Sequence, residues 1–295
     1  MNKKTIVVTG GAGFIGSNLI EKILKISDYE IISIDNYSLG TKTNHIKNNR
    51  LKYLIGSTIK IDTILKNYQN QIHSLFHFGE FSRIYQSFEN YKKCFDSNLT
   101  GSKEVFLFCL KNKIRLIYSA TSASLGNNGK DKNLSPYAFT KAKNIEFLEN
   151  LKKWFKFKFD IVYFYNVYGP NQIKKGKNAT IIGIFEEQIK NKLPLTVVKP
   201  GTQTRRFTHI DDTIDVCIKA WKEKKYCHYA ISNHKSFSII DVAKMFKGKI
   251  KYLPKRSGER FASKLTKMHL SNNIRLYYGK IKLKKYIDEF VSKQK

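Results

Sequence analysis

A glycine-rich turn close to the start of the chain constrains the fold more than any other segment. Residues 9–16 read Thr-Gly-Gly-Ala-Gly-Phe-Ile-Gly. Residues 5–9 before it are mostly β-branched, which predicts a strand, and the apolar residues after it recur at helical spacing. A glycine turn between a strand and a helix lets backbone amides approach a phosphate at the helix N-terminus. The pattern therefore predicts a nucleotide-binding strand–turn–helix unit.

An acidic residue downstream narrows the expected ligand to a dinucleotide. The next predicted strand, 30–34, is followed by Asp35, about 20 residues beyond Gly16, the spacing at which an acid bonds the ribose of a dinucleotide. Because a carboxylate repels the 2′-phosphate of NADP, we expect NAD as the cofactor. Lys42 lies close enough in sequence to leave NADP as an alternative.

The order of the predicted elements indicates an α/β fold. Strands predicted at 5–9, 30–34, 74–78, 114–119 and 159–165 alternate with helical patterns that include 97–112 and 138–153. Such alternation predicts a Rossmann-like, doubly wound parallel sheet with its ligands at the carboxyl ends of the strands. Gly10, His77, Thr121 and Asn166 should meet there, because each ends or follows a strand.

The second half of the chain predicts a smaller α+β lobe for the substrate. Helices near 180–191, 239–246 and 283–293 and a strand at 249–253 contribute to it. We assign residues 1–166 to an NAD-binding domain, with contributions from about 205–232, and residues 167–204 and 233–295 to the smaller lobe.

Composition and charge limit the classes of partner. The net charge is +31, but only eight of the 54 basic residues are Arg and the Lys residues are spread along the chain, so we expect no nucleic-acid partner. No apolar run is long enough to cross a membrane, and the N-terminus lacks a signal-peptide pattern. The four Cys residues show neither a metal-binding nor a disulfide spacing, so we expect no metal and a cytoplasmic setting.

Three polar residues in the middle of the chain predict acid–base chemistry. Tyr137 and Lys141 are four residues apart, one turn apart on a helix that Pro136 would start. A nearby ammonium favours the phenolate form of a tyrosine, which can then act as a base. The third is a hydroxyl of the segment 119–123, at the end of the strand predicted at 114–119, which could hydrogen-bond the same substrate oxygen; Ser119, Thr121 and Ser122 are all candidates at this point.

These features resemble the extended short-chain dehydrogenase/reductase family, in particular its branch of NAD-dependent nucleotide-sugar epimerases and dehydratases. The resemblance spans nearly the whole chain and is carried by 9–16, Asp35-Asn36, 76–78, Asn98 with Gly101, Tyr137 with Lys141, 166–170, 205–212 and 256–259.

The resemblance implies a role for each matching residue. The catalytic residues would be Thr121, Tyr137 and Lys141. The NAD contacts would be Gly10, Gly13, Phe14, Ile15, Gly16, Asp35, Asn36 and Lys141, and the substrate contacts Asn166, Arg205, Arg256 and Arg260, with Arg205 and Arg256 on a diphosphate. Glu80 stands where the family has small residues; an ion pair with Arg83 and a substrate contact are both open for it.

The resemblance also narrows the reaction. Dehydratases of this branch carry Thr-Asp-Glu after the fifth strand, where this chain has Thr121-Ser122-Ala123, and 3,5-epimerases carry a Cys nearby, which is missing here. The remaining machinery implies 4-epimerisation of a UDP-sugar by a homodimer, through a transient 4-keto intermediate. A nucleotide-4-keto-sugar reductase or another NAD(P)-dependent sugar-nucleotide oxidoreductase, and a non-catalytic NAD-sensing protein, remain as alternatives.

Overall fold

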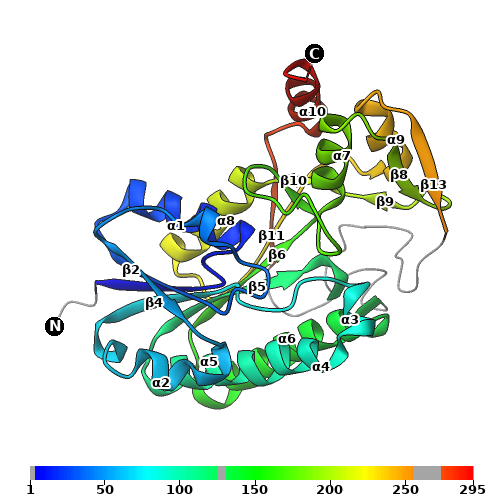
Figure 1. The fold of residues 1–295 in the computed structure, drawn as a ribbon. Helices are drawn as coiled ribbons and strands as arrows, with labels where there is room; N and C mark the ends of the chain where they lie inside the picture. The colour runs from blue at the N-terminus through cyan, green and yellow to red at the C-terminus, as the bar shows by residue number, and fades with distance from the viewer. Residues whose placement is uncertain (1–3, 125–130, 255–273, 295) are drawn as a thin grey trace.

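A parallel sheet forms the centre of the larger lobe (Figure 1). The computed structural model describes residues 4–124, 131–254 and 274–294. Within them eight strands pair in the order β14-β11-β6-β5-β4-β1-β2-β3, and every pairing is parallel. The strands are β1 (Thr5–Thr9), β2 (Glu30–Asp35), β3 (Leu51–Ile55), β4 (Ile72–His77), β5 (Arg115–Thr121), β6 (Phe159–Phe164), β11 (His228–Ser232) and β14 (Ile274–Tyr278).

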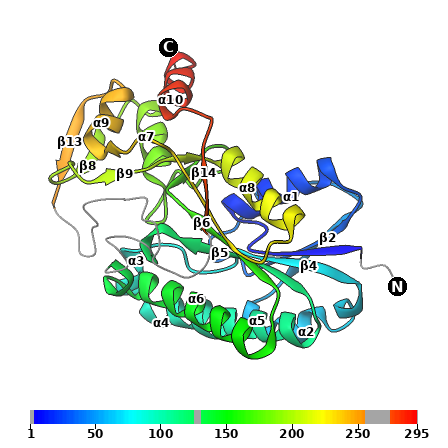
Figure 2. The same ribbon diagram turned by 180° about the vertical axis from the view of Figure 1, so that it is seen from behind.

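Helices cover both faces of this sheet, as the two opposite views show (Figures 1 and 2). One face carries α1 (Phe14–Ile26) and α8 (Ile210–Glu223), and the other carries α2 (Ile61–Leu65), α5 (Ser102–Lys111) and α6 (Pro136–Phe155). A separate buried apolar cluster fills each interface. The predicted doubly wound Rossmann-like fold is confirmed.

Several elements differ from the sequence expectations. The edge strands β3 and β14, the strand β11 and the helix α8 were not predicted; β3 and β14 are only half-buried, so their apolar pattern is weak. The helix predicted from 97 starts only at Ser102, because residues Asp96–Gly101 form a π-helical turn.

The smaller lobe has its own core. It contains α7 (Ile181–Lys190), α9 (Ile239–Met245), α10 (Leu283–Ser292), β8 (Leu195–Val198) and β13 (Ile250–Leu253), the last two paired in parallel. Phe185, Val197, Val242 and Ile287 are among its fully buried side chains. β14 falls within the range 233–295 expected for this lobe, yet it joins the large sheet.

Further short elements complete the fold. The helices α3 (Gln86–Glu89) and α4 (Tyr91–Phe95) pack against α6 in the larger lobe. The strands β7 (Val167–Tyr168) and β10 (Thr208–His209) pair with each other, as do β9 (Thr204–Arg205) and β12 (Phe237–Ser238). No helix among the described residues is both long enough and apolar enough to cross a bilayer.

The strand order places a crevice beside the glycine turn. The chain leaves β1 to build the sheet toward β2 and β3, then returns to place β4 on the other side of β1. Crossovers that leave in opposite directions open a crevice at the carboxyl ends of the two central strands, where ligands of this fold class bind.

Candidate active site

A cavity of about 840 Å³ lies at the carboxyl ends of the central strands, and residues of the smaller lobe close it from the other side. It brings together every predicted site residue that the structure describes: Gly10, Gly13, Phe14, Ile15, Gly16, Asp35, Asn36, Glu80, Thr121, Tyr137, Lys141, Asn166 and Arg205. The remaining two, Arg256 and Arg260, lie outside the described residues.

The glycine turn forms a cradle of backbone that side chains would fill. Gly10 has a φ of +71°, which favours glycine. A Cβ on Gly16 would lie 2.2 Å from the carbonyl oxygen of Gly10. The helix α1 begins at Phe14, and neither a capping side chain nor an acidic residue occupies its first turn. The exposed amides and the positive helix end suit the diphosphate of a dinucleotide.

Asp35 braces this turn from the end of β2. Its carboxylate accepts hydrogen bonds from the backbone N–H of Ala12 (3.0 Å) and of Tyr37 (2.8 Å). Burial raises the pKa of Asp35, and these two bonds act in the opposite direction. The carboxylate also borders the cavity beside Asn36, so it is placed to accept bonds from a ribose while repelling a 2′-phosphate.

The predicted catalytic residues share one wall of the cavity. α6 begins at Pro136, as predicted, and Ser135 caps it by accepting from the N–H of Ala138 (3.1 Å). This start places Tyr137 in the first helical turn, buried and bordering the cavity, with Lys141 one turn later. Thr121 borders the same space from the end of β5.

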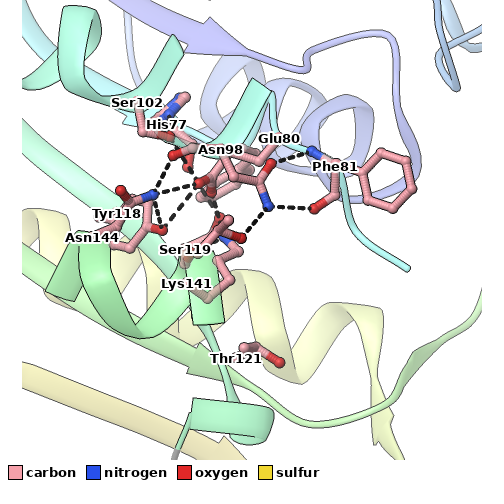
Figure 3. A network of polar contacts seen from close by, with 12 residues as sticks. His77, Glu80, Phe81, Asn98, Ser102, Tyr118, Ser119, Thr121, Lys141 and Asn144 are labelled. Atoms are coloured by element: carbon pink, nitrogen blue, oxygen red, sulfur yellow. Dashed lines mark hydrogen bonds and ion pairs between the residues drawn. The ribbon is translucent and has the colours of Figure 1, made fainter. Parts of the chain in front are cut away.

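Glu80 forms an ion pair with Lys141 (Figure 3), and among the described residues it forms none with Arg83. The ammonium of Lys141 also donates to the carbonyl oxygen of Ser119 at 2.6 Å. The guanidinium of Arg83 donates instead to the carbonyl oxygen of Asn178 at 2.7 Å, tying the 170s segment to the cavity wall. Of the two readings left open, the pairing with Arg83 is wrong, because the Glu80 carboxylate is turned toward α6 and its side chain is only 2% exposed.

His77 lies beneath the cavity and does not border it. It is completely buried at the end of β4, where Nδ1 is 2.7 Å from the hydroxyl of Thr9 and Nε2 is 2.9 Å from that of Ser102. Burial lowers the pKa of His77 to about 4, so the ring is neutral at physiological pH. His77 therefore lies at the end of its strand, as predicted, but it contacts the side chains of Thr9 and Ser102 and not the cavity.

Sequence reasoning missed the residues that surround Glu80. Ser102, Tyr118 and Asn144 all bond its Oε1 atom. Only Asn144 had a pattern that could have identified it, because it follows Lys141 by three residues and so lies on the same helical face.

The polar residues on the far wall come from the strands that lead into the smaller lobe. Asn166 follows β6 with a φ of 35° and donates from Nδ2 to the carbonyl oxygen of Arg206 at 3.1 Å. Arg205, on β9, donates to the carbonyl oxygen of Thr204 at 2.9 Å and borders the cavity. A planar guanidinium at this wall has the chemistry to bind phosphate or carboxylate oxygens.

The described part of the chain contains no cluster of side chains that could bind a metal ion. Residues 4–124, 131–254 and 274–294 contain no group of three His, Cys, Asp or Glu side chains close enough to hold an ion. All four cysteines are free thiols.

Comparison with known proteins places this arrangement among sugar-modifying enzymes. Residues 6–232 match the model of the NAD dependent epimerase/dehydratase family. A relative from Brachyspira hyodysenteriae, ADP-L-glycero-D-manno-heptose-6-epimerase, is 32% identical over 228 residues, which cover 72% of this chain and 70% of the relative.

Solved structures share the fold along nearly the whole chain. The UDP-glucose 4-epimerase of Thermotoga maritima, solved with UDP-glucose, superposes with a TM-score of 0.83 at 22% identity and covers 98% of this chain and 97% of that one. The UDP-glucuronic acid 4-epimerase of Bacillus cereus, solved with its substrate and NAD, gives a TM-score of 0.83 at 22% identity over 99% of this chain and 100% of that one.

Proposed function

Because the chain belongs to the NAD-dependent epimerase/dehydratase family, we propose that it is an NAD-dependent nucleotide-sugar epimerase that inverts C4 of a UDP-sugar through a transient 4-keto intermediate. One observation carries the proposal. Tyr137, Lys141 and Thr121 border the same cavity as the glycine turn, so a sugar hydroxyl beside Tyr137 and a cofactor on the glycine turn would share one space.

The side chains of this wall divide the work of proton transfer. Tyr137 takes the proton of the sugar hydroxyl as the carbonyl forms, and returns it when the hydroxyl is restored. Lys141, one helical turn from Tyr137, and Arg83 contribute positive charge to this wall, and Thr121 would hold the reacting oxygen by a hydrogen bond. The glycine turn and Asp35 would hold NAD, which would supply a hydride acceptor and donor for the sugar carbon.

The residues on the far wall are suited to holding the nucleotide diphosphate. Arg205 offers a planar guanidinium to phosphate oxygens, and Asn166 offers an amide to the sugar or the adjacent phosphate. Arg256 and Arg260 retain the diphosphate role that the sequence resemblance implies. Firm binding at the diphosphate keeps the keto sugar in the cavity while it turns.

A substrate panel tests this proposal. Purified protein is incubated with UDP-, GDP-, dTDP- and ADP-sugars without added cofactor, and the configuration of the sugar is read by NMR. We expect inversion at C4 of a UDP-sugar. Inversion at C6 of an ADP-heptose would instead favour the activity of the 32% identical relative. Turnover that requires added reduced cofactor would favour a keto-sugar reductase, and no turnover with bound NAD would favour a sensing protein.

A variant pair tests the role of the tyrosine. Tyr137→Phe removes the hydroxyl alone, so turnover should fall by a factor of 100 or more, on the order of what a general base contributes, while NAD binding is kept. Tyr252→Phe makes the same change at an exposed tyrosine of β13 and should leave turnover unchanged. Near-wild-type turnover in Tyr137→Phe would refute the assignment.

We also propose a homodimer formed through the helical face of α4, α5 and α6. These helices lie side by side on the outside of the larger lobe (Figures 1 and 2). Tyr91 and Phe95 of α4, Leu107 of α5 and Trp154 of α6 are between 37% and 64% exposed, and burying them against a second subunit would remove apolar surface from water. Sedimentation velocity should report twice the chain mass.

The division into an NAD-binding domain and a smaller substrate lobe remains our proposal, supported by the separate apolar cores. The free thiols support a reducing compartment such as the cytoplasm.

A further inference from the structure

Glu80 is a carboxylate buried at the floor of the active site. Its side chain is 2% exposed, and both of its oxygens accept bonds from the protein. Oε1 accepts from the hydroxyl of Ser102 (2.8 Å), the hydroxyl of Tyr118 (3.0 Å) and the amide of Asn144 (3.1 Å), and Oε2 forms the ion pair with Lys141. A carboxylate satisfied in this way has no free oxygen for a substrate.

Lys141 is held from three sides. Besides Glu80, its ammonium donates to the carbonyl oxygen of Ser119 and lies 4.7 Å from the centre of the Tyr118 ring (Figure 3). An ammonium has three N–H donors, and the ion pair and the carbonyl bond use two of them. One remains for a ligand in the cavity, which Lys141 borders.

A chain of hydrogen bonds leads from Glu80 through Ser102 and His77 to Thr9, and the donor of each bond can be assigned. Ser102 donates to Glu80, so its oxygen accepts from Nε2–H of His77, and the bare Nδ1 of His77 accepts from the hydroxyl of Thr9. The hydroxyl of Thr9 in turn accepts from the backbone N–H of Gly79 (3.0 Å). We call Thr9, His77, Ser102, Glu80, Tyr118, Asn144 and Lys141 the Glu80 network; it connects the strand before the glycine turn to the catalytic helix.

We propose that Glu80 is the positioning residue for Lys141, and that its negative charge sets the pH range in which Tyr137 works as the base. This inference rests on the epimerase function proposed above. Glu80 acts through Lys141, which lies one helical turn from Tyr137: it fixes the place of the ammonium and offsets its charge.

The other ionisable groups around the pair keep one charge state near neutral pH. Burial lowers the pKa of His77 to about 4 and raises that of the Cys94 thiol to about 11. Burial, with the Glu80 charge beside it, also raises the pKa of Tyr118 well above its usual range. His77 from β4, Cys94 from α4 and Tyr118 from β5 are therefore uncharged near pH 7.

The net charge at the floor of the cavity therefore depends strongly on the pair of Glu80 and Lys141. Arg83, on the segment after β4, is a further cation whose charge acts on Tyr137; burial lowers its pKa, but a guanidinium stays protonated. Replacing Glu80 by Gln leaves Lys141 as an uncompensated buried cation. Its field favours the phenolate form of Tyr137, and its own proton is released at lower pH because the buried ammonium has lost its partner. Both limbs of the pH–rate profile should therefore move toward acid.

The kinetic test compares the pH dependence of kcat in three proteins. Glu80→Gln should shift both limbs to lower pH by about one unit or more. Glu80→Asp keeps the charge one methylene farther from the ammonium and should lie between that variant and the wild type. Glu104→Gln, which removes a carboxylate paired with Lys103 on the surface, should keep the wild-type profile. A fall in kcat with unmoved limbs would show a merely structural role and overturn the proposal.

A second readout does not depend on turnover. Trace acetylation of the folded protein at graded pH, read by mass spectrometry, reports where the Lys141 amine loses its proton. The labelling midpoint of Lys141 should fall in Glu80→Gln, whereas Lys143, exposed two residues further on α6, serves as internal reference and should not change. An unchanged Lys141 midpoint overturns the proposal.

The two readouts separate this inference from the proposed function. Wild-type protein that epimerises no sugar contradicts the function, and the labelling still decides the role of Glu80. An active wild type with no shift in either readout contradicts the role of Glu80 alone. If Glu80→Gln does not fold, Glu80→Asp decides, since its shift should have the same sign.

Discussion

The neutral, buried His77 makes a testable contribution to stability. Its pKa of about 4 in the folded protein compares with about 6.5 in an unfolded chain. Because the folded pKa is the lower one, the unfolded state takes up the proton first as the pH falls. The contribution is complete above pH 6.5 and is lost as the pH falls toward 4. The shift corresponds to about 3 kcal/mol in full, and to about 2 kcal/mol between pH 7 and pH 5.

The assay compares urea unfolding of the wild type and His77→Gln at both pH values. At pH 7 the variant should be less stable by about 1–3 kcal/mol, because bonds to Thr9 and Ser102 are lost or weakened. At pH 5 this gap should shrink by about 2 kcal/mol, since only the wild type must bury an unprotonated histidine.

A surface histidine provides the matched control for this experiment. His234 is exposed, so His234→Gln should shift the free energy of unfolding by the same small amount at pH 7 and pH 5. An equal gap between wild type and His77→Gln at both pH values would refute the reasoning, because it would mean that the ring of His77 takes up its proton as readily in the folded protein as in the unfolded chain.

Three further changes test other parts of the structure. Gly16→Ala places a Cβ 2.2 Å from the carbonyl oxygen of Gly10, which should lower the free energy of unfolding by about 1–3 kcal/mol. NAD binding, measured by calorimetry, should be lost, and an unchanged NAD affinity would contradict the proposal that the glycine turn holds the cofactor. Asp160→Asn removes the counter-charge of the buried Arg115, which lies 2.5 Å from the Asp160 carboxylate. The free energy of unfolding, measured by thermal denaturation, should fall by about 3–5 kcal/mol. A fall of less than about 1 kcal/mol would show that the ion pair contributes little to stability. Asp35→Ser should weaken NAD binding about tenfold and strengthen NADP binding, the carboxylate being a ribose acceptor; NADP affinity that does not rise would count against this role.

Much of the fold followed from local patterns. The glycine turn, the strands at 5–9 and 30–34 and the helix that begins at Pro136 were predicted because β-branched runs, glycines and capping residues act over a few neighbouring positions. The edge strands β3 and β14 escaped because half-buried strands carry a weak apolar pattern. The π-helical turn at Asp96–Gly101 escaped because its bonding depends on what packs against it.

The candidate site likewise contains some residues that could be identified from the sequence and others that only the structure revealed. Residues next to a recognisable pattern, such as Asp35 and Tyr137, were named from the sequence, and the structure brings them to one cavity. Ser102, Tyr118 and Asn144 were not named, since each is an ordinary polar residue until the sheet and α6 bring it to Glu80.

The sequence by itself determined that the chain builds a strand–glycine–helix unit followed by an acid at the end of the next strand. It also determined that a tyrosine and a lysine lie one helical turn apart. Both relations span few residues. Only the tertiary structure decided what Glu80 does. Its choice of Lys141 over Arg83 depends on how β4, β5 and α6 pack, elements that are far apart in the chain. The same glycine turn is thereby joined, through Thr9 and His77, to the residue that would hold the catalytic lysine in place.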